Sequence, residues 1–203
     1  MDKALAHLSI HDPVIKRLID DYPAPTFKKN ANYYYELVDS IISQQLSVKA
    51  ARAIEGRFKD LFGGDYPTPE QIIARDAEEF RAVGLSYGKA RYIQDLAQKI
   101  LDGDVTFDRL DEQSNDEIIS ELTQVKGIGE WTVHMFLMFC MARLDVLPVG
   151  DLGIRNGVTK LYGLDTQATP EDVRSIAEKN NWRPYESVAS WYVWQSLENA
   201  PNG

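Results

Sequence analysis

Signals for the start of a helix recur along this chain at short intervals, and they limit the possible folds more than any other feature. Three pairs place a capping side chain directly before a proline: Asp12-Pro13, Thr68-Pro69 and Thr169-Pro170. Ser114, three residues before Glu117, fits a capping box, and Ser47 and Ser86 each precede apolar residues at helical spacing. No segment shows the alternation of a half-buried strand. The pattern predicts an all-α fold of about ten short helices.

Composition narrows the class of protein. With 203 residues, 44% of them hydrophobic, the chain can form a single domain spanning 1–203, which we expect to be a monomer. The longest apolar run, Met135–Ala142, is far shorter than the roughly 20 residues that cross a bilayer, so we expect no membrane partner. One cysteine, Cys140, and three scattered histidines give neither a disulfide framework nor metal-ligand spacing, so we expect no cofactor and no metal.

The amino terminus carries neither a basic segment nor an apolar segment of the kind that directs secretion. We therefore expect a cytoplasmic protein, associated with the nucleoid if it is bacterial and nuclear if it is eukaryotic.

The net charge of −9 argues against a nucleic-acid partner, because most DNA-binding proteins present a basic field. The charge is unevenly distributed, however, and acidic residues gather in segments such as Asp102–Glu121. Positive charge recurs elsewhere, at Lys49, Arg52, Lys89, Arg91, Lys126, Arg155 and Lys160. A local basic patch could still follow DNA phosphates.

The stretch Leu122–Thr132 predicts a tight hairpin between two helices. One helix should end at about Gln124 and the next should start near Glu130. Between them, Gly127 and Gly129 let the backbone turn sharply and expose its amide hydrogens. Those amides and the start of the second helix would form a phosphate site that grips DNA without reading its sequence. A helix–helix turn that happens to contain glycine is the alternative.

Residues around this hairpin resemble the signature of the helix-hairpin-helix DNA glycosylases. VKGIGEWTVHMF at 125–136, followed by LPVGDLGIR at 147–155, matches the hairpin and the Gly/Pro-rich loop that ends in an aspartate. Segments 41–51, 84–93 and 182–194 resemble the 3-methyladenine glycosylase branch, in order and spacing. The resemblance implies a two-lobed fold, with lobes 36–125 and 1–35 plus 126–203 and a cleft between them. Large bacterial members carry an additional β-rich amino-terminal domain, and we expect the compact form here because 203 residues are too few to hold it.

Asp151 is the catalytic carboxylate that the resemblance implies. A helix over Glu130–Ala142 would carry the chain roughly 20 Å from the hairpin, and the segment Arg143–Gly150 is long enough to return Asp151 beside Trp131. Asp151 would then cap a helix over Leu152–Leu161, where the helix dipole favours a charged carboxylate. Such a group can stabilise an oxocarbenium-like sugar or deprotonate water. The alternative is an ordinary helix cap.

Trp131 distinguishes subclasses of the family. Bifunctional members hold a Schiff-base lysine two residues past the second hairpin glycine, where this chain has Trp131. The resemblance therefore implies a monofunctional enzyme, in which the indole faces the extruded base. Cation–π contact would favour a positively charged alkylpurine over a neutral base. The alternative is that Trp131 belongs to the core.

Further residues are predicted to bind DNA. Gln44 and Gln45 precede a helix cap and could fill the gap left by a flipped nucleotide, and the resemblance points to Gln45. Phosphate contacts are expected from lysine and hairpin residues, namely Lys89, Lys126, Gly127, Gly129 and Thr132. Glu186 departs from the family, because relatives often carry arginine there, which weakens any phosphate contact from that helix.

These predictions converge on a monofunctional glycosylase that removes alkylated purines from double-stranded DNA in base excision repair. Two alternatives stay open at this point. One is a glycosylase for deaminated or etheno-purines, and the other is a non-catalytic paralogue that senses damage in DNA.

Overall fold

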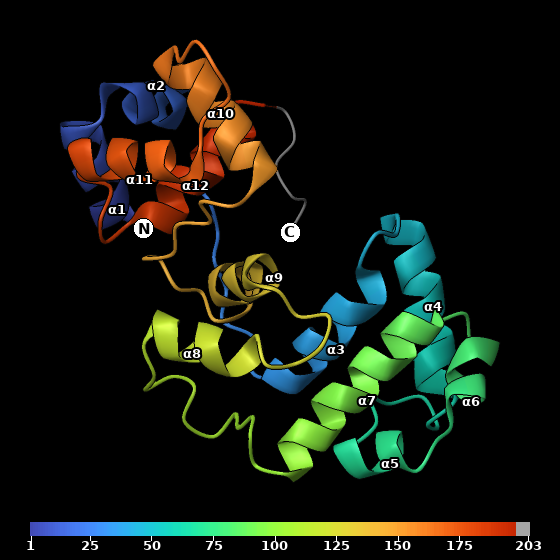
Figure 1. The fold of residues 1–203 in the computed structure, drawn as a ribbon. Helices are drawn as coiled ribbons and strands as arrows, with labels where there is room; N and C mark the ends of the chain where they lie inside the picture. Colours follow the sequence, from blue (N-terminus) through green and yellow to red (C-terminus); the bar gives the residue numbers. More distant parts are fainter. Residues whose placement is uncertain (198–203) are drawn as a thin grey trace. The chain divides into compact units, whose positions relative to one another are not determined.

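The computed structural model describes residues 1–197, and within that range it contains twelve α-helices, one π-helical turn and no strand (Figure 1). The helices are α1 (Asp2–His11), α2 (Pro13–Asp21), α3 (Tyr33–Ser43), α4 (Val48–Asp60), α5 (Pro69–Ile73), α6 (Ala77–Ala82), α7 (Tyr87–Leu101), α8 (Asn115–Leu122), α9 (Glu130–Met135), α10 (Leu152–Tyr162), α11 (Pro170–Lys179) and α12 (Glu186–Gln195). The π-helical turn η1 covers Phe136–Cys140. The predicted all-α class is confirmed.

The predicted helix caps form as the sequence indicates. The side chains of Asp12, Ser47 and Ser86 accept hydrogen bonds from the first turns of α2, α4 and α7. Thr68 and Ser114 form complete capping boxes at the starts of α5 and α8. Each cap satisfies amide hydrogens that have no partner inside the helix, which explains why these helices begin where they do. Helix α1 begins without a side-chain cap and was not predicted.

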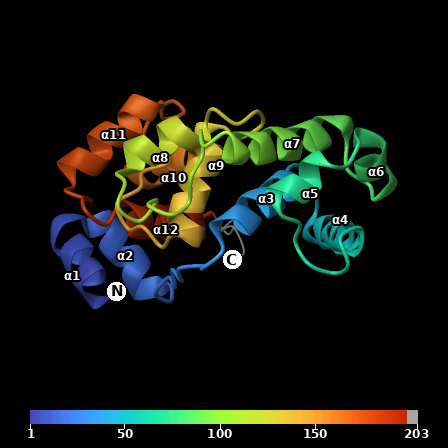
Figure 2. The same cartoon turned by 90° about the horizontal axis from the view of Figure 1, so that it is seen from below.

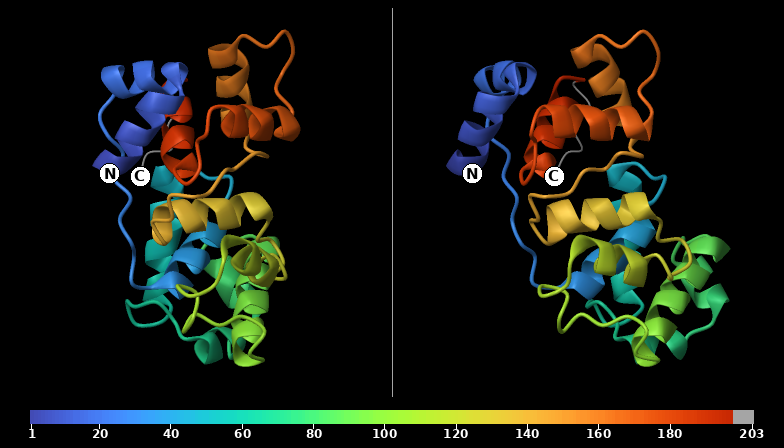
Figure 3. Two further views of the ribbon diagram at one scale, coloured as in Figure 1. Left: turned by 90° about the vertical axis from the view of Figure 1, so that its left-hand side faces the viewer. Right: turned by 60° about the vertical axis from the view of Figure 1, so that its left-hand side comes forward.

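The chain divides into two compact units. Among the described residues, unit 1 consists of 1–29 together with 137–197, and unit 2 consists of 30–136. In unit 1, α12 packs against α1, α2 and α10, so that helices from both ends of the chain lie side by side (Figure 3). In unit 2, the long helix α7 packs against α3, α5 and α6 (Figure 2).

A buried carboxylate joins distant segments of unit 1. Asp12 is fully buried, and it caps α2 by accepting hydrogen bonds from the backbone of Val14 and Ile15 at 2.8 and 3.1 Å. Its second oxygen accepts from the Tyr162 hydroxyl and, at 2.7 Å, from the Trp182 indole. Burial and the hydrogen bond to Asp12 raise the pKa of Tyr162. Four donors offset the cost of removing this charge from water.

The boundaries of unit 2, residues 30–136, differ from those of the lobe 36–125 that the family resemblance implies. The hairpin and α9 belong to unit 2, because α9 packs on α8 and the apolar side chains of Val125 and Ile128 are buried. The helix expected over Glu130–Ala142 is not one continuous α-helix. Helix α9 gives way at Phe136 to the π-helical turn η1, which ends at Cys140, and Ala142 beyond it has a left-handed backbone with φ of 57°.

Candidate carboxylate and DNA-binding residues

The predicted hairpin is present between α8 and α9. The turn closes with a hydrogen bond of 3.1 Å from the amide of Ile128 to the carbonyl of Val125. Gly127 has φ of +83°, and a Cβ there would lie 2.2 Å from the ring of Tyr92, so both backbone conformation and packing require glycine. Gly129 caps α9, and a Cβ there would meet no atom within 4 Å. The second glycine therefore borders open space, which suits the approach of a phosphate.

Lys126 is fixed to the adjacent helix α7 through Asp95. The carboxylate of Asp95 accepts a hydrogen bond from the Lys126 amide at 2.9 Å and lies 3.1 Å from its ammonium. The Lys126 side chain is 75% exposed, so this ion pair is weak and the ammonium can exchange Asp95 for another anion. Asp95 was not predicted from the sequence, and it holds the hairpin backbone as well as the charge.

The side chains of Gln44 and Lys89 both form hydrogen bonds within the protein, which their predicted roles in DNA binding do not require. The amide of Gln44 donates to the carbonyl of Gly127 at 2.8 Å, which links the end of α3 to the hairpin. The ammonium of Lys89 donates to the carbonyls of Ile42 and Gln44 at 2.7 and 2.6 Å, and so caps the end of α3. Partial burial lowers the pKa of Lys89. Direct DNA contact by either residue stays a prediction.

Gln45 lies at the tip of the turn between α3 and α4. It is exposed and has φ of 57°, a left-handed conformation that costs energy in a residue other than glycine. The neighbouring apolar side chains of Leu46 and Val48 are 38% and 63% exposed. Ser47 caps α4 and so fixes the end of the turn. A strained tip that presents exposed side chains on a capped helix is the geometry expected of a wedge, and the wedge role of Gln45 stays a prediction.

Trp131 and Thr132 lie in the first turn of α9. Trp131 is 53% exposed, whereas a core tryptophan would be buried, so the alternative that it belongs to the core does not fit. Thr132 is partly exposed. An exposed tryptophan directly after the predicted phosphate-binding turn can present a ring face to a base. Its pocket role, like the DNA contact of Thr132, stays a prediction.

Asp151 caps α10, as predicted, and two donors hold one of its oxygens. Oδ1 accepts hydrogen bonds of 2.8 Å from the amide of Ile154 and of 2.8 Å from the indole of Trp194. The carboxylate is partly exposed, at the amino end of an eleven-residue helix. A carboxylate held in this way can stabilise a developing positive charge or accept a proton from water.

Comparison with known proteins shows the family to which this chain belongs. A family model for HhH-GPD superfamily base excision DNA repair proteins matches residues 38–183. The chain belongs to this superfamily. DNA-3-methyladenine glycosylase 1 of Schizosaccharomyces pombe is 38% identical over 98% of this chain and 89% of its own length.

Two solved structures are similar to this HhH-GPD protein over nearly its whole length. The 3-methyladenine DNA glycosylase Mag1 of Schizosaccharomyces pombe, in complex with abasic DNA, covers 99% of both chains at 38% identity with a TM-score of 0.81. A DNA-3-methyladenine glycosidase of Bacillus halodurans covers 95% of this chain and 88% of its own at 35% identity, with a TM-score of 0.85. The predicted helix-hairpin-helix fold is confirmed.

Trp194 is a second residue of this HhH-GPD protein, besides Asp95, that contacts a candidate site residue and was not predicted from the sequence. No motif in the sequence marks Trp194 as a partner of the candidate carboxylate, yet its indole donates a hydrogen bond to it. The available signal was the pair Gly153 and Gly157, one turn apart on α10. Small residues at that spacing predict the close approach of another helix, and α12 is the helix that packs there.

Glu186, at the start of α12, is a buried acid and offers no contact for a phosphate. It is 7% exposed at the first position of the helix, and burial raises the pKa of its carboxyl. Its neighbour Asp145 acts in the same direction, whereas Arg183 and His7 act against it. A buried acid in place of an exposed arginine agrees with the weakened phosphate contact expected from the sequence.

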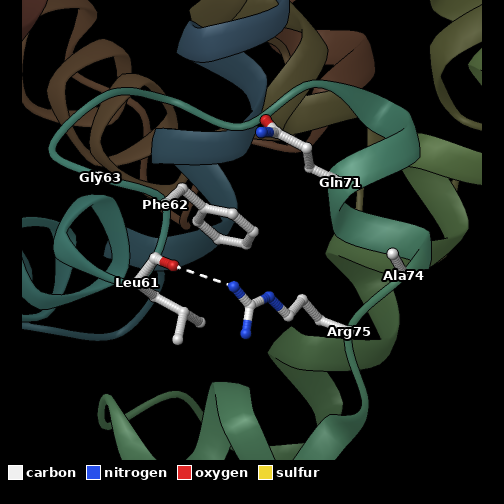
Figure 4. A pocket seen from close by; sticks show the side chains of 6 residues that line it. All are labelled: Leu61, Phe62, Gly63, Gln71, Ala74 and Arg75. Carbon is white, nitrogen blue, oxygen red and sulfur yellow. Dashed lines mark hydrogen bonds between the residues drawn. The ribbon is translucent and has the colours of Figure 1, made fainter.

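A hollow elsewhere in unit 2 contains none of the predicted site residues. It has a volume of about 500 Å³ and is lined by Leu61, Phe62, Gly63, Gln71, Ala74 and Arg75 (Figure 4). The guanidinium of Arg75 lies over the Phe62 ring and donates to the Leu61 carbonyl at 3.3 Å.

Within residues 1–197, no cluster of His, Cys, Asp or Glu side chains is arranged to hold a metal ion. Over the same range, no helix has the length and apolar character needed to span a bilayer.

Proposed function

We propose that this HhH-GPD protein is a monofunctional DNA glycosylase, which hydrolyses the N-glycosidic bond of alkylated purines such as 3-methyladenine and 7-methylguanine in double-stranded DNA. The observation that carries the proposal is the carboxylate of Asp151, capping α10 in a chain that is 38% identical to a DNA-3-methyladenine glycosylase. The same proposal places the protein where cellular DNA lies, in the cytoplasm of a bacterium or the nucleus of a eukaryote.

The chemistry follows from what a fixed carboxylate can do. The bond between the sugar C1′ and the purine nitrogen breaks, its electron pair leaves with the base, and positive charge develops on the sugar. The Asp151 carboxylate stabilises that charge and accepts a proton from the water whose oxygen bonds to C1′. A cationic alkylpurine takes the electron pair and leaves as a neutral molecule, so no general acid is needed. The products are a free base and an abasic site.

Trp131 and the hairpin supply selectivity and grip. The indole attracts a cationic base more strongly than a neutral one, and its exposure leaves the ring accessible. The amides around Gly129 bind one DNA backbone without reading its sequence. This division of roles explains how a protein with net charge −9 can act on DNA, because only a few phosphates need to be contacted.

The direct test is to incubate the protein with methylated double-stranded DNA and to identify the released bases by chromatography. Asp151→Asn is the control, since the amide oxygen can still accept the bonds that cap α10. We expect the wild type to release 3-methyladenine and 7-methylguanine, and the variant to be slower by ~10²–10³-fold or more. Trp131→Ala should reduce release of cationic bases more than of neutral ones.

Parallel substrates test the two alternative functions. DNA containing hypoxanthine or an etheno-purine, released faster than methylated purines, would replace the proposed lesion class. Tight binding to damaged DNA, with no base released from any substrate and no difference between wild type and Asp151→Asn, would indicate the non-catalytic paralogue.

A further inference from the structure

The indole of a buried tryptophan, Trp194, donates a partly buried hydrogen bond to the candidate carboxylate. Its Nε1 donates to Oδ1 of Asp151 at 2.8 Å, and the tryptophan is 3% exposed. The ring also lies near Phe139, with 6.1 Å between centroids, so its position is fixed by packing. A hydrogen bond to a charged acceptor is stronger than one between neutral groups.

Two glycines on α10 make this contact possible. A Cβ on Gly157 would lie 2.4 Å from a methyl carbon of Val193, so glycine there lets α12 lie against α10. A Cβ on Gly153 would lie 3.0 Å from Oδ1 of Asp151 and 3.0 Å from Cδ1 of Trp194. Any larger side chain at position 153 would crowd the hydrogen bond itself. Both glycines therefore serve the approach of Trp194 to Asp151.

We propose that Trp194 is a positioning residue for base excision, which acts by holding the Asp151 carboxylate in one orientation through its indole N–H. The inference rests on the proposed function. Because Ile154 and Trp194 donate to the same oxygen, the carboxyl group cannot rotate without losing a hydrogen bond. Misplacement of a reacting group by about 1 Å can cost roughly 100-fold in rate.

The chain offers a matched control at Trp182. This tryptophan is also buried in unit 1, and its indole donates at 2.7 Å to a different carboxylate, that of Asp12. Trp194→Phe and Trp182→Phe therefore remove the same N–H group and the same ring volume. Only the first variant removes a donor from Asp151, so a comparison of the two separates positioning from general loosening of the unit.

The rate experiment measures single-turnover excision of methylated DNA, together with the dissociation constant for DNA, well below the melting temperature of each variant. We expect Trp194→Phe to slow excision by roughly 10- to 100-fold without a change in DNA affinity. Trp182→Phe should lower the melting temperature and leave the excision rate near that of the wild type. A wild-type rate for Trp194→Phe, or equal slowing by both variants, would overturn the proposal.

A spectroscopic experiment tests the contact apart from activity. The chain has four tryptophans, so the indole N–H signals in a proton–nitrogen correlation spectrum can be assigned individually. Asp151→Asn keeps an acceptor but removes its charge, which weakens the hydrogen bond, so it should shift the Trp194 signal and leave the Trp182 signal in place. An unshifted Trp194 signal would refute the hydrogen bond. If the shift occurs but the wild type releases no base, the proposed function fails while the contact stands.

Discussion

The side-chain amide of Gln44 donates a hydrogen bond to the backbone carbonyl of Gly127 at 2.8 Å, and this bond joins the turn after α3 to the hairpin. The carbonyl of Gln44 in turn accepts from the ammonium of Lys89 on α7. Tyr92 and Asp95, also on α7, contact Gly127 and Lys126 of the hairpin. One face of α7 therefore supports both turns that are predicted to meet DNA, so that they should respond to mutation together.

Gln44→Ala should weaken binding to damaged and undamaged DNA alike, by about 2- to 10-fold, because the hairpin loses one hydrogen bond. Gln45→Asn is the comparison, since asparagine tolerates the left-handed backbone at position 45 but shortens the exposed side chain. That variant should leave binding to undamaged DNA unchanged and slow excision. Fluorescence anisotropy with both duplexes measures binding, and base release in a single turnover measures excision. Slower excision by Gln44→Ala with weaker general binding by Gln45→Asn would exchange the two roles.

Lys126→Glu should weaken binding to every duplex by a similar factor, because phosphate contacts position a protein without reading the base. The slope of log affinity against log salt concentration should become shallower by about 0.9, the value for one phosphate contact. Lys3→Glu, an equal charge change at an exposed position on α1, controls for net charge. A change in lesion preference on Lys126→Glu, or an equal effect of Lys3→Glu, would contradict a phosphate contact.

With Trp131 in place of a Schiff-base lysine, the protein should release bases without cutting the strand. Damaged DNA should be nicked only after alkali or heat, as seen on a denaturing gel. Treatment with borohydride should trap no covalent protein–DNA complex, because position 131 carries no amine. A trapped complex would falsify the monofunctional assignment.

Asp39 should make stability depend on pH. Burial, assisted by the nearby carboxylates of Glu55 and Glu36, raises the pKa of Asp39 to about 6, against an opposing effect of Lys59. The folded state therefore prefers the protonated form, and this stabilising contribution is present below about pH 4 and is lost as the pH rises through 6.

Asp39→Asn should accordingly stabilise the protein at pH 8 by about 1 kcal/mol, after allowance for solvent screening, and raise the melting temperature by about 2–4 °C. The gain should shrink as the pH falls through 6 and vanish well below pH 4, where the wild-type carboxyl is protonated in both the folded and the unfolded state. Asp165→Asn, at an exposed position after α10, is the control and should show no such trend. A gain at pH 4 as large as at pH 8 would rule out titration of Asp39 as the cause.

Helix starts were predictable because their causes are local. A capping side chain and the amides that it satisfies lie within three residues, so Asp12, Ser86 and Asp151 could be assigned from neighbours in the sequence. The hairpin was predictable for the same reason, and the family resemblance gave roles to Asp151 and Trp131.

The contacts that hold the candidate residues were not predictable, because they join segments far apart in the chain. Lys89 carries a positive charge that suggested a phosphate, but its acceptors are backbone carbonyls more than forty positions away. Trp194 lies 43 positions from Asp151, and only the packing of α12 on α10 brings them together. The change from α9 to η1 likewise carries no local signal comparable to a cap.

The division of the chain sets an order in which its parts can fold during synthesis. Unit 2 is continuous in sequence, whereas Asp12 must wait for Tyr162 and Trp182, and Asp151 must wait for Trp194. Because chains fold from the amino terminus as they are made, the hairpin should form while the ribosome is still translating the part of unit 1 that follows residue 136. A nascent or truncated chain should therefore be able to hold DNA before it can break a glycosidic bond in it.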